Sequence, residues 1–275
     1  MHDNNKLIHA DCLEWMQSQP DNAVDFTIGS PPYVYKGHRY RGGKSVKWSV
    51  ETWIEFMLPI VREAVRITDG YVVFVVNGAV HKDEYHPACE GLVYRIYIEA
   101  ERGKIVCERP VIWSKNAPPN RKGEWFKNGW EFCLAFKTPD TKPYFDWEAI
   151  AEPPKYKAGG DFRQRDAKGE RRKGGSYPKG KLAMPGDLIR ATVGGGHMGH
   201  KLAHETEAPY PEKLIEPFVQ ACCPRGGIVF DPFCGSGSSA AVAKRFGRRY
   251  ITIDNRQSQI DLATRRIADT KVEST

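Results

Sequence analysis

Short apolar runs alternate along this chain with longer segments in which apolar residues recur at helical spacing. The runs at residues 24–28, 71–76 and 228–230 are rich in Val, Ile and Phe, which is typical of buried strands. Residues 51–67 and 213–222 show the spacing of amphipathic helices. Further strands are predicted at 7–10, 92–100, 109–114, 130–136 and 250–253, and further helices from about residue 13, at 238–246 and at 257–268. This alternation predicts an α/β fold built on a sheet.

The pattern breaks between residues 138 and 200. This segment is rich in Pro, Gly and charged residues and has little apolar periodicity. Its part from Lys155 to Lys181 holds ten Lys or Arg residues against three Asp or Glu residues. We therefore predict one main domain formed by residues 1–137 and 201–275, interrupted by an inserted basic region at 138–200.

Composition narrows the class of protein. The 275 residues carry a formal net charge of +7, which favours a polyanionic partner. Seven cysteines are scattered without a C-x-x-C pair, as expected of a reduced intracellular protein, and no metal site is expected. The longest apolar run has six residues, whereas a membrane span needs roughly 20. The N-terminus lacks the apolar core of a signal peptide, so we expect a cytoplasmic protein without membrane attachment.

A glycine loop, Asp231-Pro232-Phe233-Cys234-Gly235-Ser236-Gly237, joins the strand at 228–230 to the next helix. Its glycines permit close backbone approach to a ligand, and the N–H groups of the following helix point at that ligand. Asp254 lies 17 residues beyond Gly237 (254 − 237), at a distance suited to binding both ribose hydroxyls of a nucleoside. An ordinary strand-to-helix turn and a dinucleotide site are the alternatives. A dinucleotide fits less well because the third glycine of its fingerprint is missing, and because Asp231 suits a cationic sulfonium amino acid.

A second loop, Ser30-Pro31-Pro32-Tyr33, follows the strand at 24–28. The two prolines fix the backbone and remove two N–H donors, which leaves the Ser30 hydroxyl and nearby carbonyl oxygens as a row of acceptors. Such a row suits the exocyclic NH₂ group of cytosine or adenine, and Tyr33 offers a face on which the base can stack. The alternative is a turn stiffened by proline for structural reasons alone.

The two loops resemble those of the amino-methylating DNA methyltransferases, a family that uses S-adenosylmethionine to modify cytosine N4 or adenine N6. Its catalytic loop is Ser/Asn/Asp-Pro-Pro-Tyr and its cofactor loop is Asp-Pro-Phe-x-Gly-x-Gly. The catalytic loop precedes the cofactor loop here, which is similar to the β-class order, and the resemblance covers residues 6–137 and 204–268. Residues 9–13 resemble the family's Gly-Asp-Cys-Leu motif, with Ala10 in place of glycine, and 208–212 resemble the segment that closes over the methionine end.

The resemblance implies a Rossmann-like methyltransferase sheet in which the basic insertion is the target-recognition region. It implies that the following residues bind S-adenosylmethionine: Asp11, Cys12, Asp231, Phe233, Gly235, Ser236, Gly237 and Asp254. The catalytic residues would be Ser30, Pro31, Pro32 and Tyr33. Serine at the first loop position goes mostly with N4-cytosine methylation in this family, while adenine N6 or an RNA base remain alternatives.

The implied mechanism is direct methyl transfer to a base flipped from the duplex. Tyr33 would stack on the base, while Ser30 and the Pro31 carbonyl would accept hydrogen bonds from its amine and orient the nitrogen lone pair. Because Ser30 is a poor base, the proton is expected to leave to water. Asp11, Phe233 and Asp254 are expected to contact the adenosine.

Basic side chains in two segments are the expected DNA contacts. They are Lys36, Arg39, Arg41 and Lys44 beside the catalytic loop, and Arg163, Arg165, Arg171, Arg172 and Lys173 in the insertion, whose arginines have the chemistry to read guanine. A solvated stretch without this role is the alternative for the insertion. A non-catalytic DNA-binding protein of the same fold and a nicotinamide oxidoreductase are the rival functions. A homodimer and a cognate restriction endonuclease are left open as partners.

Overall fold

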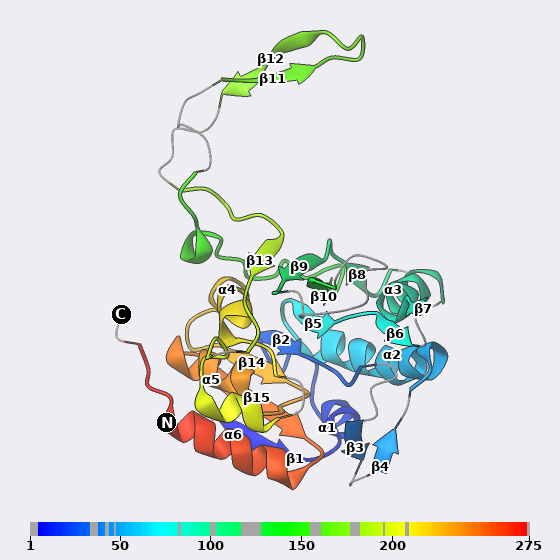
Figure 1. The fold of residues 1–275 in the computed structure, drawn as a ribbon, viewed down its shortest axis with the longest axis vertical. Helices are drawn as coiled ribbons and strands as arrows, with labels where there is room; N and C mark the ends of the chain where they lie inside the picture. The colour runs from blue at the N-terminus through cyan, green and yellow to red at the C-terminus, as the bar shows by residue number, and fades with distance from the viewer. Residues whose placement is uncertain are drawn as a thin grey trace.

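The computed structural model describes residues 5–33, 38–41, 44–46, 48–81, 84–99, 103–116, 128–154, 161–176, 182–194, 196–206 and 209–273. Its centre is a sheet in which nearly all of the predicted strands pair (Figure 1). In spatial order the strands are β1 (Lys6–His9), β15 (Arg249–Asp254), β14 (Ile228–Asp231), β2 (Phe26–Gly29), β5 (Val72–Val76), β10 (Trp130–Lys137), β9 (Val111–Ser114) and β13 (Leu188–Arg190), and β8 (Val106–Cys107) pairs with β10. The strands from β1 to β5 run parallel, and β10 is antiparallel to both of its neighbours in this order.

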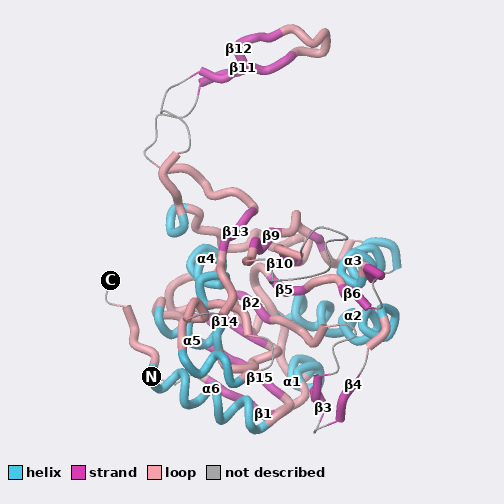
Figure 2. Tube along the Cα trace, in the orientation of Figure 1, coloured by secondary structure: helices cyan, strands magenta, loops and turns pink. Residues whose placement is uncertain are grey.

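Helices cover both faces of this sheet (Figure 2). One face packs against α1 (Cys12–Gln17), α2 (Val50–Ile67) and α3 (Ala88–Glu99), and the other against α4 (Glu212–Cys222), α5 (Ser238–Arg245) and α6 (Gln257–Asp269). Strand β5 shows why its run is fully apolar. Val72, Phe74 and Val76 enter the first core, while Val73 and Val75 enter the second. The predicted α/β sheet is thus confirmed.

The strand predicted at residues 92–100 is wrong, because residues 92–99 lie in α3, and residue 100 is outside the described residues. Its Val, Ile and Tyr content favours a strand, but the buried positions follow helical spacing. Ala88, Leu92 and Ile96 recur every four residues and are all buried in the core that α2 shares. Tertiary packing therefore overrides the local preference for extended structure.

The segment at 138–200 contains a short 3₁₀ turn, η1 (Glu148–Ile150), and an antiparallel hairpin of β11 (Asp161–Arg165) and β12 (Arg171–Ser176). Figure 1 shows this hairpin at the end of the molecule, away from the main sheet. Strand β13 then joins the edge of the main sheet, parallel to β9, so the chain returns to the sheet before residue 200. The 3₁₀ turn η2 (Lys201–Glu205) follows.

Two further hairpins are short: β3 (His38–Arg41) pairs with β4 (Lys44–Val46), and β6 (Ala79–His81) pairs with β7 (Glu84–His86). Of the helices within the described residues, none combines the length and the apolar character that crossing a bilayer requires.

Candidate active site

The order of the strands places the two predicted loops side by side. The chain leaves β14 through α5 toward β15, and it leaves the neighbouring β2 through α2 toward β5, on the opposite side. In an open α/β sheet, ligands bind at the carboxyl ends of strands where the order reverses in this way. Gly29, the last residue of β2, marks the contact, since a Cβ atom there would lie 2.7 Å from Asp231 Oδ1. The two loops therefore form one site.

The loop predicted to be catalytic, at residues 30–33, is held in place by contacts from α2 and β5. Pro31 and Pro32 are buried, and the indole nitrogen of Trp53 donates a 2.6 Å hydrogen bond to the Pro32 carbonyl. The Ser30 hydroxyl has two possible acceptors, the Val75 carbonyl at 3.0 Å and Tyr33 Oη at 3.3 Å. Because either bond uses the hydroxyl proton, the lone pairs of Ser30 Oγ are able to accept a hydrogen bond from a ligand.

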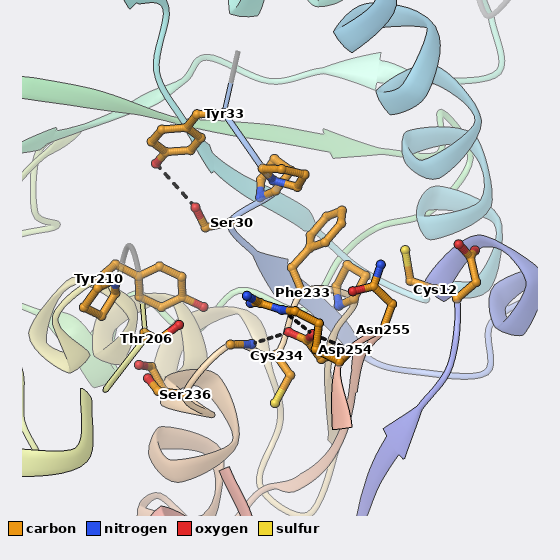
Figure 3. A pocket seen from close by; sticks show the side chains of 18 of the residues that line it. Cys12, Ser30, Tyr33, Thr206, Tyr210, Phe233, Cys234, Ser236, Asp254 and Asn255 are labelled. Atoms are coloured by element: carbon orange, nitrogen blue, oxygen red, sulfur yellow. Dashed lines mark hydrogen bonds and ion pairs between the residues drawn. The ribbon is translucent and has the colours of Figure 1, made fainter. Parts of the chain in front are cut away.

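Tyr33 is fixed by a polar group that was not predicted from the sequence. Its hydroxyl donates to Glu131 Oε2 at 2.7 Å, and Ser30 Oγ lies 3.3 Å from it (Figure 3). Burial, reinforced by the Glu131 charge, raises the pKa of Tyr33 well above its ordinary value. Glu131 comes from β10 and is ion-paired with Lys115. The signal in the sequence is an acidic residue inside the apolar strand predicted at 130–136.

The side chain of Asp231, the first residue of the glycine loop, is not among those that line the pocket. Its carboxylate accepts hydrogen bonds from the Phe233 backbone N–H at 2.9 Å and from the Tyr210 hydroxyl at 3.3 Å, and it also contacts the Ser239 hydroxyl. Complete burial raises its pKa to about 6, although these hydrogen bonds oppose the shift. The structure thus gives Asp231 a loop-forming role, and its predicted contact with a ligand stays a prediction.

Asp254 ties the glycine loop to the end of β15. Its Oδ2 accepts the Gly235 backbone N–H at 3.0 Å, and its Oδ1 accepts the Arg256 backbone N–H at the same distance. Burial raises the pKa of Asp254. Asp11 caps α1, where its carboxylate accepts from the Leu13 N–H at 2.9 Å. Both carboxylates line the pocket.

One pocket joins the two loops. Figure 3 shows Ser30 and Tyr33 at one end of it, Asp254 and Asn255 at the other, and Phe233 between them. The Phe233 ring packs against Phe56 and Phe74, with centroids 6.5 and 6.2 Å away, which makes this middle part apolar. Several residues that line the pocket were not singled out from the sequence: Trp48, Phe56, Thr206, Asn255 and Arg256.

Some of the other residues predicted to bind the cofactor line the pocket, and others support the glycine loop. Cys12, Gly235 and Ser236 line the pocket. Gly237 instead adopts a φ of 77° and packs so closely on α6 that a Cβ would lie 2.8 Å from the Ala263 side chain. Beneath the loop, Arg266 is fully buried and donates to Ser236 Oγ at 2.8 Å.

This support continues into α4. Arg266 also donates to Ser238 Oγ at 2.9 Å and to Glu212 Oε1 at 2.5 Å. Glu212, buried at the start of α4, pairs with Arg245 as well. The segment at 208–212 that was predicted to close over the ligand therefore contributes Tyr210 to the pocket and Glu212 to its support, while Ala208 lies outside the described residues.

The predicted DNA-contact residues of the insertion are not among those that line this pocket. Lys36 lies outside the described residues, and the backbones of Arg39, Arg41 and Lys44 lie in β3 and β4. The remaining five are exposed on β11 and β12: Arg163, Arg165, Arg171, Arg172 and Lys173. Arg172 pairs with Asp166 at 2.6 Å and Lys173 with Asp161 at 3.0 Å.

The residues of the pocket favour a reaction in which a group passes between two ligands that the pocket holds in the correct orientation. Its two acids are a helix cap and a loop tie, and the pKa of the Cys12 thiol is raised to about 12 by burial and by Asp11, so this thiol is a poor nucleophile at neutral pH. A rigid hydrogen-bond acceptor at one end, an apolar middle and a carboxylate at the other end fit a planar amine beside a nucleoside.

Comparison with known proteins agrees with this interpretation of the pocket. The model of a family described as DNA methylase matches residues 24–265. The Type II methyltransferase M.ScaI of Streptomyces caespitosus is 26% identical over 268 residues, which cover 95% of this chain and 80% of that protein. The Type II methyltransferase M.BglII of Bacillus subtilis is 29% identical over 270 residues, which cover 94% of this chain and 68% of that protein.

Solved structures share the fold. The PvuII DNA methyltransferase, described as cytosine-N4-specific, superposes with a TM-score of 0.71 at 16% identity over 98% of this chain and 88% of that one. TTHA0409 of Thermus thermophilus, solved in complex with S-adenosyl-L-methionine, superposes with a TM-score of 0.60 at 21% identity over 96% of this chain and 93% of that one.

Proposed function

Because the chain belongs to the DNA methylase family that acts on N6 or N4 amino groups, we propose that it methylates the N4 amino group of cytosine in DNA. The chain is an S-adenosylmethionine-dependent DNA methyltransferase, and the open point is which base it modifies. The observation that carries the choice is Ser30. Its hydroxyl proton is donated to the Val75 carbonyl or to Tyr33 Oη, which leaves a neutral acceptor for an amine at the first position of the loop.

The pocket fits the cofactor that the family uses. Phe233 would pack on the adenine, and the raised pKa and burial of Asp254 mark a carboxylate that gains from donors such as ribose hydroxyls. Thr206, Tyr210 and Ser236 line the part of the pocket suited to the methionine end. When bound, S-adenosylmethionine supplies an electrophilic methyl group on a sulfonium.

The chain's own residues orient the amine. Ser30 Oγ and the Pro31 carbonyl would accept the two amine hydrogens, while the Pro32 carbonyl is already used by Trp53. Tyr33, anchored through its hydroxyl, would present its ring to the flipped base. These contacts stabilise positive charge as it develops on the nitrogen, and fixed orientation lowers the barrier by as much as roughly 7–11 kcal/mol.

The hairpin of β11 and β12 is the proposed DNA-contact element. Arg163 pairs across the strands with Lys173, and Arg165 with Arg171. Directly opposite like charges destabilise a hairpin, and a polyanion that lies against that face would relieve this repulsion. A two-stranded ribbon also fits the major groove of DNA, where arginine can bind guanine.

The names of the two curated relatives as Type II methyltransferases support a place in a restriction–modification system with a cognate endonuclease. Seven free cysteines are consistent with a cytoplasmic enzyme. A homodimer stays a prediction.

The test is to incubate the purified protein with labelled S-adenosylmethionine and mixed-sequence duplex DNA, and to identify the methylated nucleoside by mass spectrometry after digestion. We expect N4-methylcytosine, and we expect Ser30→Ala to lose it while still binding the cofactor. N6-methyladenine would retain the family assignment and overturn the choice of base. Single-stranded DNA and RNA serve as parallel substrates, and methylation of RNA alone would contradict the proposal.

A further inference from the structure

A buried carboxylate stands directly behind the catalytic loop. Glu131 is 6% exposed, and its two oxygens contact different partners: Oε1 pairs with the Lys115 ammonium and Oε2 accepts the Tyr33 hydroxyl. A buried ion pair adds little net stability, because the cost of desolvating both charges offsets their attraction. Its position at the end of the catalytic loop invites a functional explanation.

Hydrogen bonds connect this carboxylate with the pocket. The Ser30 hydroxyl can turn its single proton from the Val75 carbonyl to Tyr33 Oη, which lies 3.3 Å away (Figure 3). Tyr33 Oη donates to Glu131 at 2.7 Å, so with Ser30 in this orientation both protons point toward the carboxylate. Because burial and the Glu131 charge raise the pKa of Tyr33, the phenol keeps its proton and remains a donor.

Methyl transfer to an amine releases a proton that Ser30 cannot keep. The nitrogen gains a methyl group and must lose one of its two hydrogens to become neutral. A hydroxyl group can accept that proton only by giving up its own. The proton acceptor that these hydrogen bonds reach is the Glu131 carboxylate, which is two hydrogen bonds away from Ser30.

We propose that Glu131 is the acceptor of the proton released in methyl transfer, through Tyr33 and Ser30, an inference that rests on the proposed function. As the bond from nitrogen to methyl forms and the bond from sulfur to methyl breaks, the amine proton passes to Ser30 Oγ. The Ser30 proton passes to Tyr33 Oη, and the Tyr33 proton passes to the Glu131 carboxylate. After these steps the nucleobase is neutral and methylated, and Ser30 and Tyr33 have regained their hydroxyl protons. Glu131 is then a carboxylic acid, which later gives its proton to water.

This relay gives a second role to Tyr33 besides stacking. The relay takes the place of water, which the sequence alone had favoured as the acceptor of the proton. Lys115 stabilises the carboxylate before the reaction. Because the Lys115 side chain is 17% exposed, the Glu131–Lys115 pair contacts solvent, and the proton can leave to it.

The experiment measures single-turnover methylation of mixed-sequence duplex DNA by the full chain in H₂O and in D₂O. Tyr33→Phe keeps the ring and the Glu131–Lys115 pair but removes the middle of the relay, and Glu131→Gln removes its end. We expect each variant to lose about 100-fold in rate, the lower end of what proton transfer contributes, with cofactor affinity unchanged. We expect the double variant to lose no more than either single one, and the solvent isotope effect of the wild type to vanish in all three.

Glu108→Gln is the matched control, since Glu108 pairs with Lys137 at 2.8 Å, at the other end of β10, and should leave the rate unchanged. If Glu131→Gln does not fold, as judged by thermal unfolding, Tyr33→Phe decides alone. A wild-type rate in Tyr33→Phe, an unchanged isotope effect, or losses that multiply in the double variant would overturn the relay. A wild type that methylates no base would instead overturn the proposed function, and the relay with it.

Discussion

At the scale of single residues, Asp231 is a carboxyl group whose pKa differs between the folded and unfolded chain. Its ordinary value of 3.8 is raised to about 6 by complete burial. The folded protein therefore holds this proton more tightly than the unfolded chain does. The stability that results is fully present below about pH 4 and is lost as the pH rises through about 6, because a charge must then exist in the interior.

Asp231→Asn removes this titration while keeping an acceptor for the Phe233 N–H and the Tyr210 hydroxyl. The free energy of unfolding of the wild type should fall between pH 4 and pH 7 by about 3 kcal/mol more than that of the variant, since a shift of roughly two units is worth about 1.4 kcal/mol per unit. Urea unfolding at each pH measures the difference. Asp140→Asn, at an exposed carboxylate, is the control, and parallel pH curves for Asp231→Asn and wild type would contradict the assignment.

Single residues also show how far sequence reasoning reaches. The Ser30 loop and Asp254 were predicted because each follows a recognisable strand, and the structure places both in one pocket. Asp231 was predicted as a ligand contact from its negative charge, but a sequence does not reveal that its carboxylate accepts the Phe233 backbone N–H within its own loop. Glu131 was missed because it lies 98 residues from Tyr33, and only the pairing of β10 with β5 brings them together.

At the scale of elements, the site depends on how closely β2 approaches the loop after β14. Gly29→Ala would place a methyl group 2.7 Å from Asp231 Oδ1 and 3.3 Å from Pro232, so one loop must shift away from the other. We expect a loss of about 1–3 kcal/mol in the free energy of unfolding, as for overpacked cores. We expect about 100-fold slower methylation, since a displacement of about 1 Å misaligns the reacting groups.

Gly186→Ala is the matched control, because a Cβ there meets no atom within 4 Å. Urea unfolding and single-turnover methylation measure the two effects. Normal methylation by a folded Gly29→Ala protein would show that the distance between the loops is not critical.

The elements themselves were predictable where local and tertiary preferences agree. Strand β5 and helix α2 have patterns that match their buried faces, and their bounds differ from the prediction by one residue. Helix α3 was missed because its β-branched and aromatic residues favour a strand, while its packing on α2 depends on a partner distant in sequence. The hairpin of β11 and β12 has no core pattern at all, so its pairing could not be read from apolar periodicity.

That hairpin carries a prediction of its own. Replacing Arg163, Arg165 and Arg171 by Ala should weaken binding to duplex DNA and lower the slope of log affinity against log salt by about 0.9 for each phosphate that the variant no longer neutralises. The hairpin should remain intact, since removing the like-charge pair of Arg165 and Arg171 relieves repulsion. Fluorescence anisotropy over a salt series measures the slope. Arg265→Ala on α6 is the control, and an unchanged slope in the triple variant would place the DNA elsewhere.

At the scale of the whole molecule, the pocket gathers segments from both ends of the chain. The described residues that contribute to its wall include 10–12, 30–33, 206, 209–210, 232–236, 238 and 254–256, so a ligand there links β1, β2, β14 and β15. A ligand that binds only the folded chain stabilises it by about 2.7 kcal/mol at a concentration 100 times its Kd. S-adenosylmethionine should therefore raise the melting temperature of the entire chain in one transition.

The rise in melting temperature should depend on the end of the pocket that holds Asp254, and not on the end that holds Ser30 and Tyr33. Asp254→Ala loses the tie to the Gly235 N–H and the proposed contact to ribose, and should abolish the rise in melting temperature. Tyr33→Phe should keep it, because the Tyr33 hydroxyl faces Glu131 at the end where the base would enter. Differential scanning fluorimetry with and without cofactor measures both. A rise that survives in Asp254→Ala, or is lost in Tyr33→Phe, would mean that the cofactor occupies the pocket in the opposite sense.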